Sequence, residues 1–155
     1  MLVYRIVHEK YSKTLFASGL EGRWNSAGKK VLYTAETVSL AYLETMNYRK
    51  GFGFNNDFKI MVIELPKIED FLKVETSDLA KNWRDFRNYE CCQEVGNQWF
   101  EEAKNLIMKV PSAVVPENFN VVINTLHPLY KKVKLIDSLN FYPDERLELI
   151  LKKYK

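Results

Sequence analysis

Glu44 is the first residue of chemical interest, because it stands in a segment that is apolar on nearly every helical side. The segment reads LAYLETM over residues 40–46, and a helix with apolar residues all around it is normally buried. A buried carboxylate must be paired, hydrogen-bonded or used in chemistry. The alternative interpretation places Glu44 at the edge of the helix, where its carboxylate reaches water.

Arg23 is a second candidate, in a loop that contains Gly22, Trp24, Asn25 and, shortly afterwards, Gly28. An arginine among glycines can present its guanidinium to a phosphate or a carboxylate, because its donors form a planar fork. The alternative is a surface arginine beside a buried tryptophan. The sequence of the loop is compatible with both interpretations.

Polar residues also gather around apolar segments towards the C-terminal end, where Ser112, Asn120 and Asn124 precede the pair His127-Pro128. No GxSxG elbow accompanies Ser112, so we expect its hydroxyl to donate a hydrogen bond rather than to attack a substrate. His127 is followed by proline, a position more typical of a histidine that stabilises a turn than of a general base.

Several common kinds of site are excluded by their missing motifs. The sequence contains no P-loop, no GxGxxG after a strand, no HExxH and no zinc pattern. Its two cysteines, Cys91 and Cys92, are adjacent, so a disulfide between them would be strained and they make a poor metal site. We therefore expect reduced thiols, no bound metal and a cytoplasmic location.

The charge pattern argues against nucleic acid and membranes as partners. The net charge is only +3, and the lysines are spread along the chain rather than concentrated in one segment. No apolar run approaches the ~18 residues of a membrane span, and the first residues lack the features of a signal peptide. We expect no direct nucleic-acid binding and no membrane association.

Both strands and helices must position the candidate residues. Short strands are predicted at residues 2–7, 31–33, 58–65, 112–115, 120–123 and 133–136. Helices are predicted from a cap at Thr37 or Ser39 to about Tyr48, with a stop at Gly51, at 90–108 with a bend near Gly96, and at 144–154. These elements do not alternate as βαβ units, so we expect an α+β fold in one domain over residues 1–155.

Taken in order, the motifs resemble the RES domain, a family named for an arginine, a glutamate and a serine. The resemblance extends roughly from Val3 to Leu147. The matching segments are GRWN at 22–25 with Gly28, LYTA at 32–35, AYLE at 41–44, Trp83, Gly96, Trp99, PSAVVP at 111–116, Asn120, Asn124, His127-Pro128, Asp144 and Arg146-Leu147.

Two positions depart from the pattern of that family. Thr125 follows Asn124 where the family usually has a proline, and Asn47-Tyr48 stands where it often has a histidine. Neither departure involves the arginine, tyrosine, glutamate or serine of the motifs. The resemblance therefore still implies activity, and the departures concern the fine shape of the pocket.

The resemblance implies a fold related to the ADP-ribosyltransferases such as diphtheria toxin, with mixed, mainly antiparallel sheets and flanking helices. It implies a toxin of a type II toxin–antitoxin system that cleaves the nicotinamide–ribose bond of NAD⁺. NAD⁺ is then a substrate, and no separate cofactor is expected. The implied partners are a cognate helix-turn-helix antitoxin and a second copy of the chain in a homodimer.

The resemblance also implies a role for each candidate residue. Glu44 would stabilise the sugar cation that forms as nicotinamide leaves, because negative charge beside an oxocarbenium lowers its energy. Arg23 would hold the diphosphate, and Tyr33 would stack on the nicotinamide ring. Ser112 would bond the nicotinamide end or position Glu44, and Asn120 is a further substrate-binding candidate that could instead be structural.

Two alternatives stay open at this point. Water as acceptor gives an NAD⁺ glycohydrolase, which we favour, whereas a protein side chain as acceptor gives an ADP-ribosyltransferase. The chain could instead be a non-enzymatic RNA- or protein-binding domain with an exposed basic and aromatic face. An enzyme predicts that the candidate side chains converge on one site, and a binding module predicts that they scatter.

Overall fold

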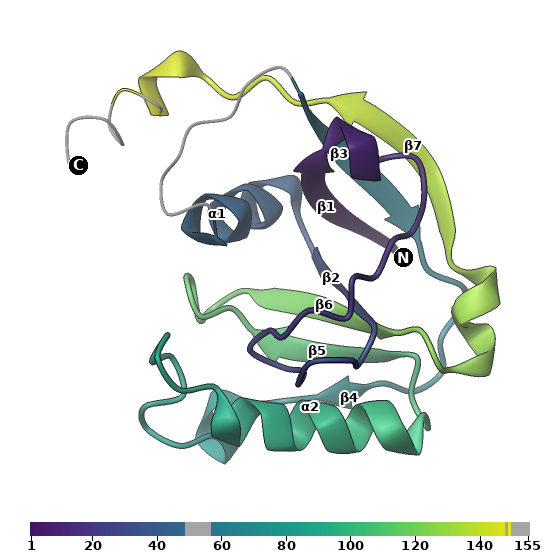
Figure 1. Cartoon of the computed structure of the whole chain (residues 1–155), viewed down its shortest axis with the longest axis vertical. Coiled ribbons are helices and arrows are strands. Elements are labelled where there is room, and N and C mark those ends of the chain that lie inside the picture. The colour runs from purple at the N-terminus through teal and green to yellow at the C-terminus, as the bar shows by residue number, and fades with distance from the viewer. Residues whose placement is uncertain (49–56, 148, 150–155) are drawn as a thin grey trace.

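A single sheet of seven strands runs through the described part of the chain in the computed structural model, which describes residues 1–48, 57–147 and 149 (Figure 1). The strand order is β4-β5-β6-β2-β1-β3-β7, and every neighbouring pair is antiparallel except β4 and β5. The strands are β1 Leu2–His8, β2 Val31–Ala35, β3 Phe58–Glu64, β4 Leu72–Lys73, β5 Ile107–Pro111, β6 Phe119–Asn124 and β7 Lys134–Asn140. The expected α+β class, with a mainly antiparallel sheet, is confirmed.

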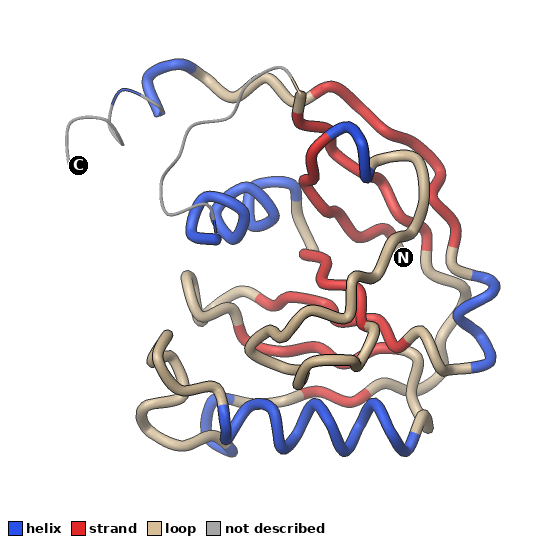
Figure 2. The backbone as a smooth tube through the Cα atoms, in the orientation of Figure 1, coloured by secondary structure: helices blue, strands red, loops and turns tan. Residues whose placement is uncertain are grey.

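Among the described residues, the α-helices α1 at Val38–Tyr48 and α2 at Glu90–Glu102 accompany the sheet, and Figure 1 shows α2 running alongside β4 and β5. Short 3₁₀ helices occupy Glu9–Tyr11, Thr76–Asp78 and Pro128–Lys132. Figure 2 shows that the connection from the first of these to β2 is a long loop. Among the described residues, no helix is long and apolar enough to cross a membrane.

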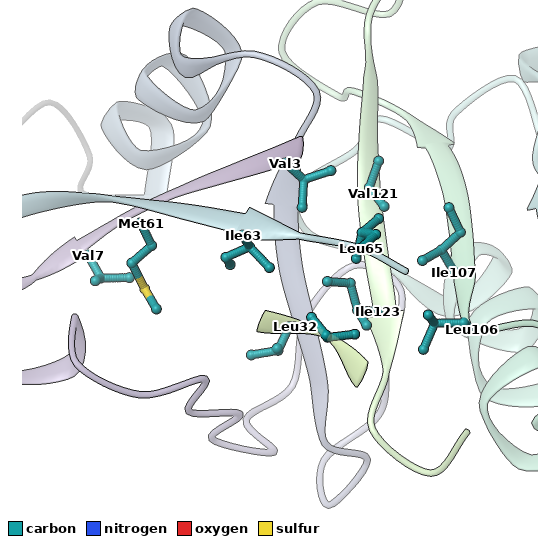
Figure 3. Close-up of a cluster of buried hydrophobic side chains, with 11 residues drawn as sticks. Val3, Val7, Leu32, Met61, Ile63, Leu65, Leu106, Ile107, Val121 and Ile123 are labelled. Atoms are coloured by element: carbon teal, nitrogen blue, oxygen red, sulfur yellow. The ribbon is translucent and has the colours of Figure 1, made fainter. Parts of the chain in front are cut away.

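The alternation of side chains along the strands divides the core between the two faces of the sheet. On one face, Leu32, Ile107 and Ile123 belong to a cluster of buried aliphatic side chains that also includes residues of β1 and β3 (Figure 3). On the other face, Val110 and Val122 pack with residues of α2, and Ala35 packs with residues of α1. Both helices therefore cover this second face, which we call the helix face.

Most of the predicted elements correspond to observed ones. The predicted strands at 2–7, 31–33, 58–65, 120–123 and 133–136 correspond to β1, β2, β3, β6 and β7, and the first predicted helix corresponds to α1. The predicted stop at Gly51 lies outside the described residues. The predicted helix at 144–154 also lies partly outside them, and its described residues 145–147 and 149 are helical.

The prediction of a helix over 90–108 is wrong in its last part. α2 ends at Glu102, Ala103 adopts a left-handed conformation with φ 47°, and β5 begins at Ile107. A short apolar run such as residues 106–108 fits a buried strand as well as a buried helix. The predicted strand at 112–115 is also wrong, because those residues form a turn between β5 and β6. The helix is not interrupted near Gly96, since α2 continues through this residue.

Candidate active site

The carboxylate of Glu44 is held by two side-chain donors that come from the sheet. Glu44 lies in the middle of α1 and is half-buried. Its Oε1 accepts a hydrogen bond from Ser112 Oγ at 2.7 Å and another from Asn120 Nδ2 at 2.6 Å. No described residue donates a hydrogen bond to the second oxygen, Oε2. The contacts fix the carboxylate through one oxygen and leave the other as an acceptor.

Ser112 follows β5 directly and is fully buried. Its Oγ accepts hydrogen bonds from the backbone N–H groups of Val114 at 3.1 Å and Val115 at 2.9 Å. Such a turn, in which a hydroxyl bonds the backbone that follows it, holds the side chain in one orientation. The single hydroxyl hydrogen is therefore directed at the Glu44 carboxylate.

Asn120 reaches Glu44 from β6, where it lies opposite Ala35 of β2 and Val110 of β5. Residues that are opposite one another in antiparallel strands point to the same face, so Asn120 lies on the helix face. This placement explains how an amide from the sheet contacts a carboxylate on α1.

Tyr33 lies on the same face, two residues before Ala35 on β2. Its hydroxyl donates to Asn25 Oδ1 at 2.6 Å and accepts from the backbone N–H of Trp24 at 3.0 Å. Burial raises the pKa of Tyr33 well above its usual range, and the Trp24 hydrogen bond and the Arg23 charge only partly oppose this rise in pKa. The tyrosine hydroxyl therefore holds the loop of residues 22–29, which we call the arginine loop, against the sheet.

The guanidinium of Arg23 faces backbone carbonyl groups of the segment that precedes α2. Nη1 donates to the carbonyl of Trp83 and, at 3.5 Å, to that of Asp85, and Nη2 donates to the carbonyl of Arg84 at 3.3 Å. The guanidinium carbon also lies 4.5 Å from the centroid of the Tyr89 ring, a cation–π distance. In this structure, Arg23 therefore fixes the backbone of residues 83–85 through hydrogen bonds.

The predicted site residues thus form two groups on the helix face. Glu44, Ser112 and Asn120 are joined by hydrogen bonds, and Tyr33 is joined to the loop of Arg23. Within the described ranges, no hydrogen bond or ion pair connects one group to the other. A surface cavity of about 380 Å³ is lined by Glu21, Phe86, Arg87, Asn88, Tyr89, Glu90 and Gln93, of which Tyr89 contacts the guanidinium of Arg23 through its ring.

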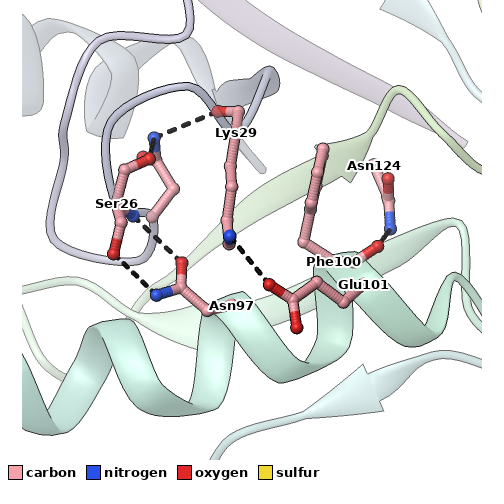
Figure 4. Close-up of polar contacts among 7 residues, drawn as sticks. Ser26, Lys29, Asn97, Phe100, Glu101 and Asn124 are labelled. Atoms are coloured by element: carbon pink, nitrogen blue, oxygen red, sulfur yellow. Dashed lines mark hydrogen bonds and ion pairs between the residues drawn. The ribbon is translucent and has the colours of Figure 1, made fainter.

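One face of α2, which the sequence analysis did not single out, holds the arginine loop. Gln93 Nε2 contacts the carbonyl oxygen of Gly22 at 3.0 Å. Asn97 exchanges two hydrogen bonds with Ser26, and Glu101 forms an ion pair with Lys29 at 2.8 Å (Figure 4). The three helix residues are spaced by four, which places them on one side of α2. That spacing of polar residues is the signal from which this contact could have been predicted.

Gly96 lies on the same helix and permits its close approach to the loop. A Cβ atom at this position would stand 1.9 Å from the carbonyl oxygen of Trp24. Gly22 is similarly enclosed, since a Cβ there would stand 2.7 Å from the hydroxyl of Tyr33. Both glycines are required because backbone or a fixed side chain fills the space that a larger residue would need.

Residues 2–147 match the model of the RES domain, and the chain belongs to this family. A relative named Toxin Res from Photorhabdus laumondii subsp. laumondii is 31% identical over 153 residues, which cover 95% of this chain and 97% of the relative. A relative named Prs ADP-ribosylating toxin from Sphingobium sp. (strain YBL2) is 31% identical over 128 residues, with 81% and 80% covered.

A solved structure shows the same fold. A chain in the crystal structure of the M. tuberculosis MbcT–MbcA toxin–antitoxin complex superposes with a TM-score of 0.70 at 16% sequence identity. The superposition covers 98% of this chain and 88% of the other.

Proposed function

We propose that the protein is the toxin of a toxin–antitoxin pair and that it hydrolyses NAD⁺ at the nicotinamide–ribose bond. The geometry of Glu44 carries the proposal. Its carboxylate is oriented by Ser112 and Asn120 through Oε1, and Oε2 has no donor among the described residues. A fixed carboxylate whose second oxygen has no donor in the described part of the chain suits a substrate that develops positive charge and carries a hydroxyl.

The reaction needs little from the protein besides this carboxylate. As the bond to nicotinamide breaks, the ribose becomes an oxocarbenium-like cation, and nicotinamide leaves as a neutral molecule that requires no general acid. A carboxylate that accepts a hydrogen bond from the ribose 2-hydroxyl stabilises that cation. Ser112 and Asn120 hold Glu44 in place before the substrate arrives, so its reorientation does not add to the barrier.

Tyr33 and Arg23 are proposed to bind the two ends of the substrate. The ring of Tyr33 lies on the helix face with Asn120, and we assign it to the nicotinamide ring. We assign Arg23 to the diphosphate, and this role requires the guanidinium to exchange a carbonyl partner at residues 83–85 for a phosphate oxygen. Substrate binding is therefore expected to loosen the contact between Arg23 and that segment.

The names of the relatives support the biological setting of the proposal. Several carry the name Toxin Res, and the structural neighbour comes from a toxin–antitoxin complex. On this basis we propose a cognate antitoxin that blocks the site. From the resemblance to the family we further propose that this antitoxin is of the helix-turn-helix class, that the chain forms a homodimer and that it is cytoplasmic.

A second candidate function is transfer of ADP-ribose to a protein. The relative from Sphingobium named Prs ADP-ribosylating toxin favours it, because 81% of this chain aligns with that protein. Both reactions pass through the same cation and differ only in the acceptor.

The ratio of nicotinamide to free ADP-ribose distinguishes hydrolysis by water from transfer to a protein. Purified protein without its antitoxin is incubated with NAD⁺, and nicotinamide and free ADP-ribose are measured by chromatography. Hydrolysis predicts equal release of both products in the absence of any other protein. Nicotinamide release that needs an added protein and leaves ADP-ribose bound to it would instead establish the transferase. No release, either from the purified protein alone or after a cell lysate is added as a source of target proteins, would refute both enzymatic proposals.

A further inference from the structure

Residue 84 connects the arginine loop with the turn that holds Ser112. On one side, the carbonyl oxygen of Arg84 accepts a hydrogen bond from Arg23 Nη2 at 3.3 Å. On the other side, the exposed side chain of Arg84 donates from Nε to the carbonyl of Ala113 at 2.8 Å and from Nη2 to that of Val114 at 3.4 Å. This guanidinium has no part in the proposed binding of NAD⁺.

The two carbonyl groups held by Arg84 belong to the peptide units that orient Ser112. The carbonyl of Ala113 shares a planar unit with the N–H of Val114, and the carbonyl of Val114 shares one with the N–H of Val115. These two N–H groups are the donors to Ser112 Oγ. Because a peptide unit is planar, a contact that fixes its oxygen also fixes its N–H.

We propose that Arg84 is a positioning residue for Glu44 and acts through the Ser112 turn. Its guanidinium holds the oxygen ends of two peptide units, whose N–H ends hold Ser112 Oγ, and Ser112 directs its hydrogen at Glu44 Oε1. The inference rests on the proposed function only for its consequence in catalysis. Its structural part, that Arg84 orders the turn, stands independently of the reaction.

The variants are Arg84→Ala, Arg84→Lys and the control Lys81→Ala, which removes an exposed positive charge from the same segment. Hydrogen exchange of the amides of Val114 and Val115 is measured by NMR in the full chain. In Arg84→Ala, both amides are expected to exchange faster than in the wild type. Arg84→Lys should restore part of the protection, and Lys81→Ala should leave the exchange rates unchanged. Unchanged exchange at both amides would overturn the proposal, whether or not the protein cleaves NAD⁺.

Kinetics then test the route through Ser112. Turnover of NAD⁺ is expected to fall about tenfold in Arg84→Ala with KM nearly unchanged, since the residue orients Glu44 and does not touch substrate. In a Ser112→Ala background, the same substitution should cause little further loss, because residues that act through one another are not additive. If the losses of turnover caused by Arg84→Ala and Ser112→Ala multiply in the double variant, the proposed route through Ser112 is wrong. A change confined to KM would also contradict it and would indicate that Arg84 binds the substrate directly.

Discussion

Two polar side chains of the proposed site, Ser112 and Tyr33, have every hydrogen-bonding role taken by a neighbouring residue. Ser112 receives two backbone N–H groups and donates to Glu44, and Tyr33 receives one N–H group and donates to Asn25. Buried polar groups that are satisfied in this way keep one orientation, because each alternative leaves a donor or acceptor unpaired. Orientation at the site is thus a property of single residues and their partners.

The Tyr33 hydroxyl yields a prediction about stability at high pH. Burial raises its pKa in the folded state, so the unfolded chain ionises first as the pH rises through about 10, the ordinary tyrosine pKa. The stability that the neutral hydroxyl contributes is fully present below that pH and declines above it. At pH 8, Tyr33→Phe should cost about 1 kcal/mol for each of the two lost hydrogen bonds.

Urea unfolding between pH 8 and 11 measures this effect as the stability difference between wild type and Tyr33→Phe. The difference should narrow above pH 10, because only the wild type loses stability through this hydroxyl. Tyr142→Phe is the matched control, since Tyr142 is 72% exposed. A difference that stays constant to pH 11 would show that the hydroxyl ionises equally well in the folded state.

At the scale of elements, the contact between α2 and the arginine loop depends on one side of the helix. The polar side chains of Gln93, Asn97 and Glu101 bond the loop, and Gly96 lets the backbones approach. The loop in turn carries Arg23, and Tyr33 ties it to the sheet. The position of Arg23 is therefore set by α2 and β2 together.

Gly96→Ala tests this contact. In an exposed helix the substitution would stabilise, but here the new Cβ would lie 1.9 Å from the carbonyl oxygen of Trp24, so α2 and the loop must separate. We expect a loss of about 1–3 kcal/mol in the free energy of unfolding, measured with urea, and weaker NAD⁺ binding. Glu94→Ala, on the exposed side of α2, is the control. A stabilised Gly96→Ala protein would mean that the contact is looser than described.

Sequence patterns predicted some of these elements and missed others for physical reasons. The strands with several β-branched residues, such as β3 and β6, were predicted within a residue or two. The two-residue β4 has no periodic signal, and the apolar start of β5 was read as the end of a helix. The turn at Ser112 was missed because its side-chain bonds to the backbone replace the strand pairing that its apolar neighbours suggested.

At the scale of the molecule, the site is assembled from segments far apart in sequence. Glu44 and Asn120 are 76 positions apart, and the sheet order places β2, which leads into α1, beside β6. The family motifs identified Glu44, Ser112 and Asn120, and the structure brings these three into contact. Arg84 could not be found in this way, because its role depends on where residues 83–85 lie relative to the Ser112 turn.

The central claim is that Glu44 stabilises the developing cation, and Glu44→Gln tests it most directly. The amide keeps the size of the side chain and an acceptor oxygen but removes the negative charge. Turnover should fall by roughly 10²–10³-fold, while NAD⁺ binding, measured by calorimetry, stays close to that of the wild type. Glu94→Gln on the exposed side of α2 should retain full turnover. Full turnover in Glu44→Gln would contradict the account.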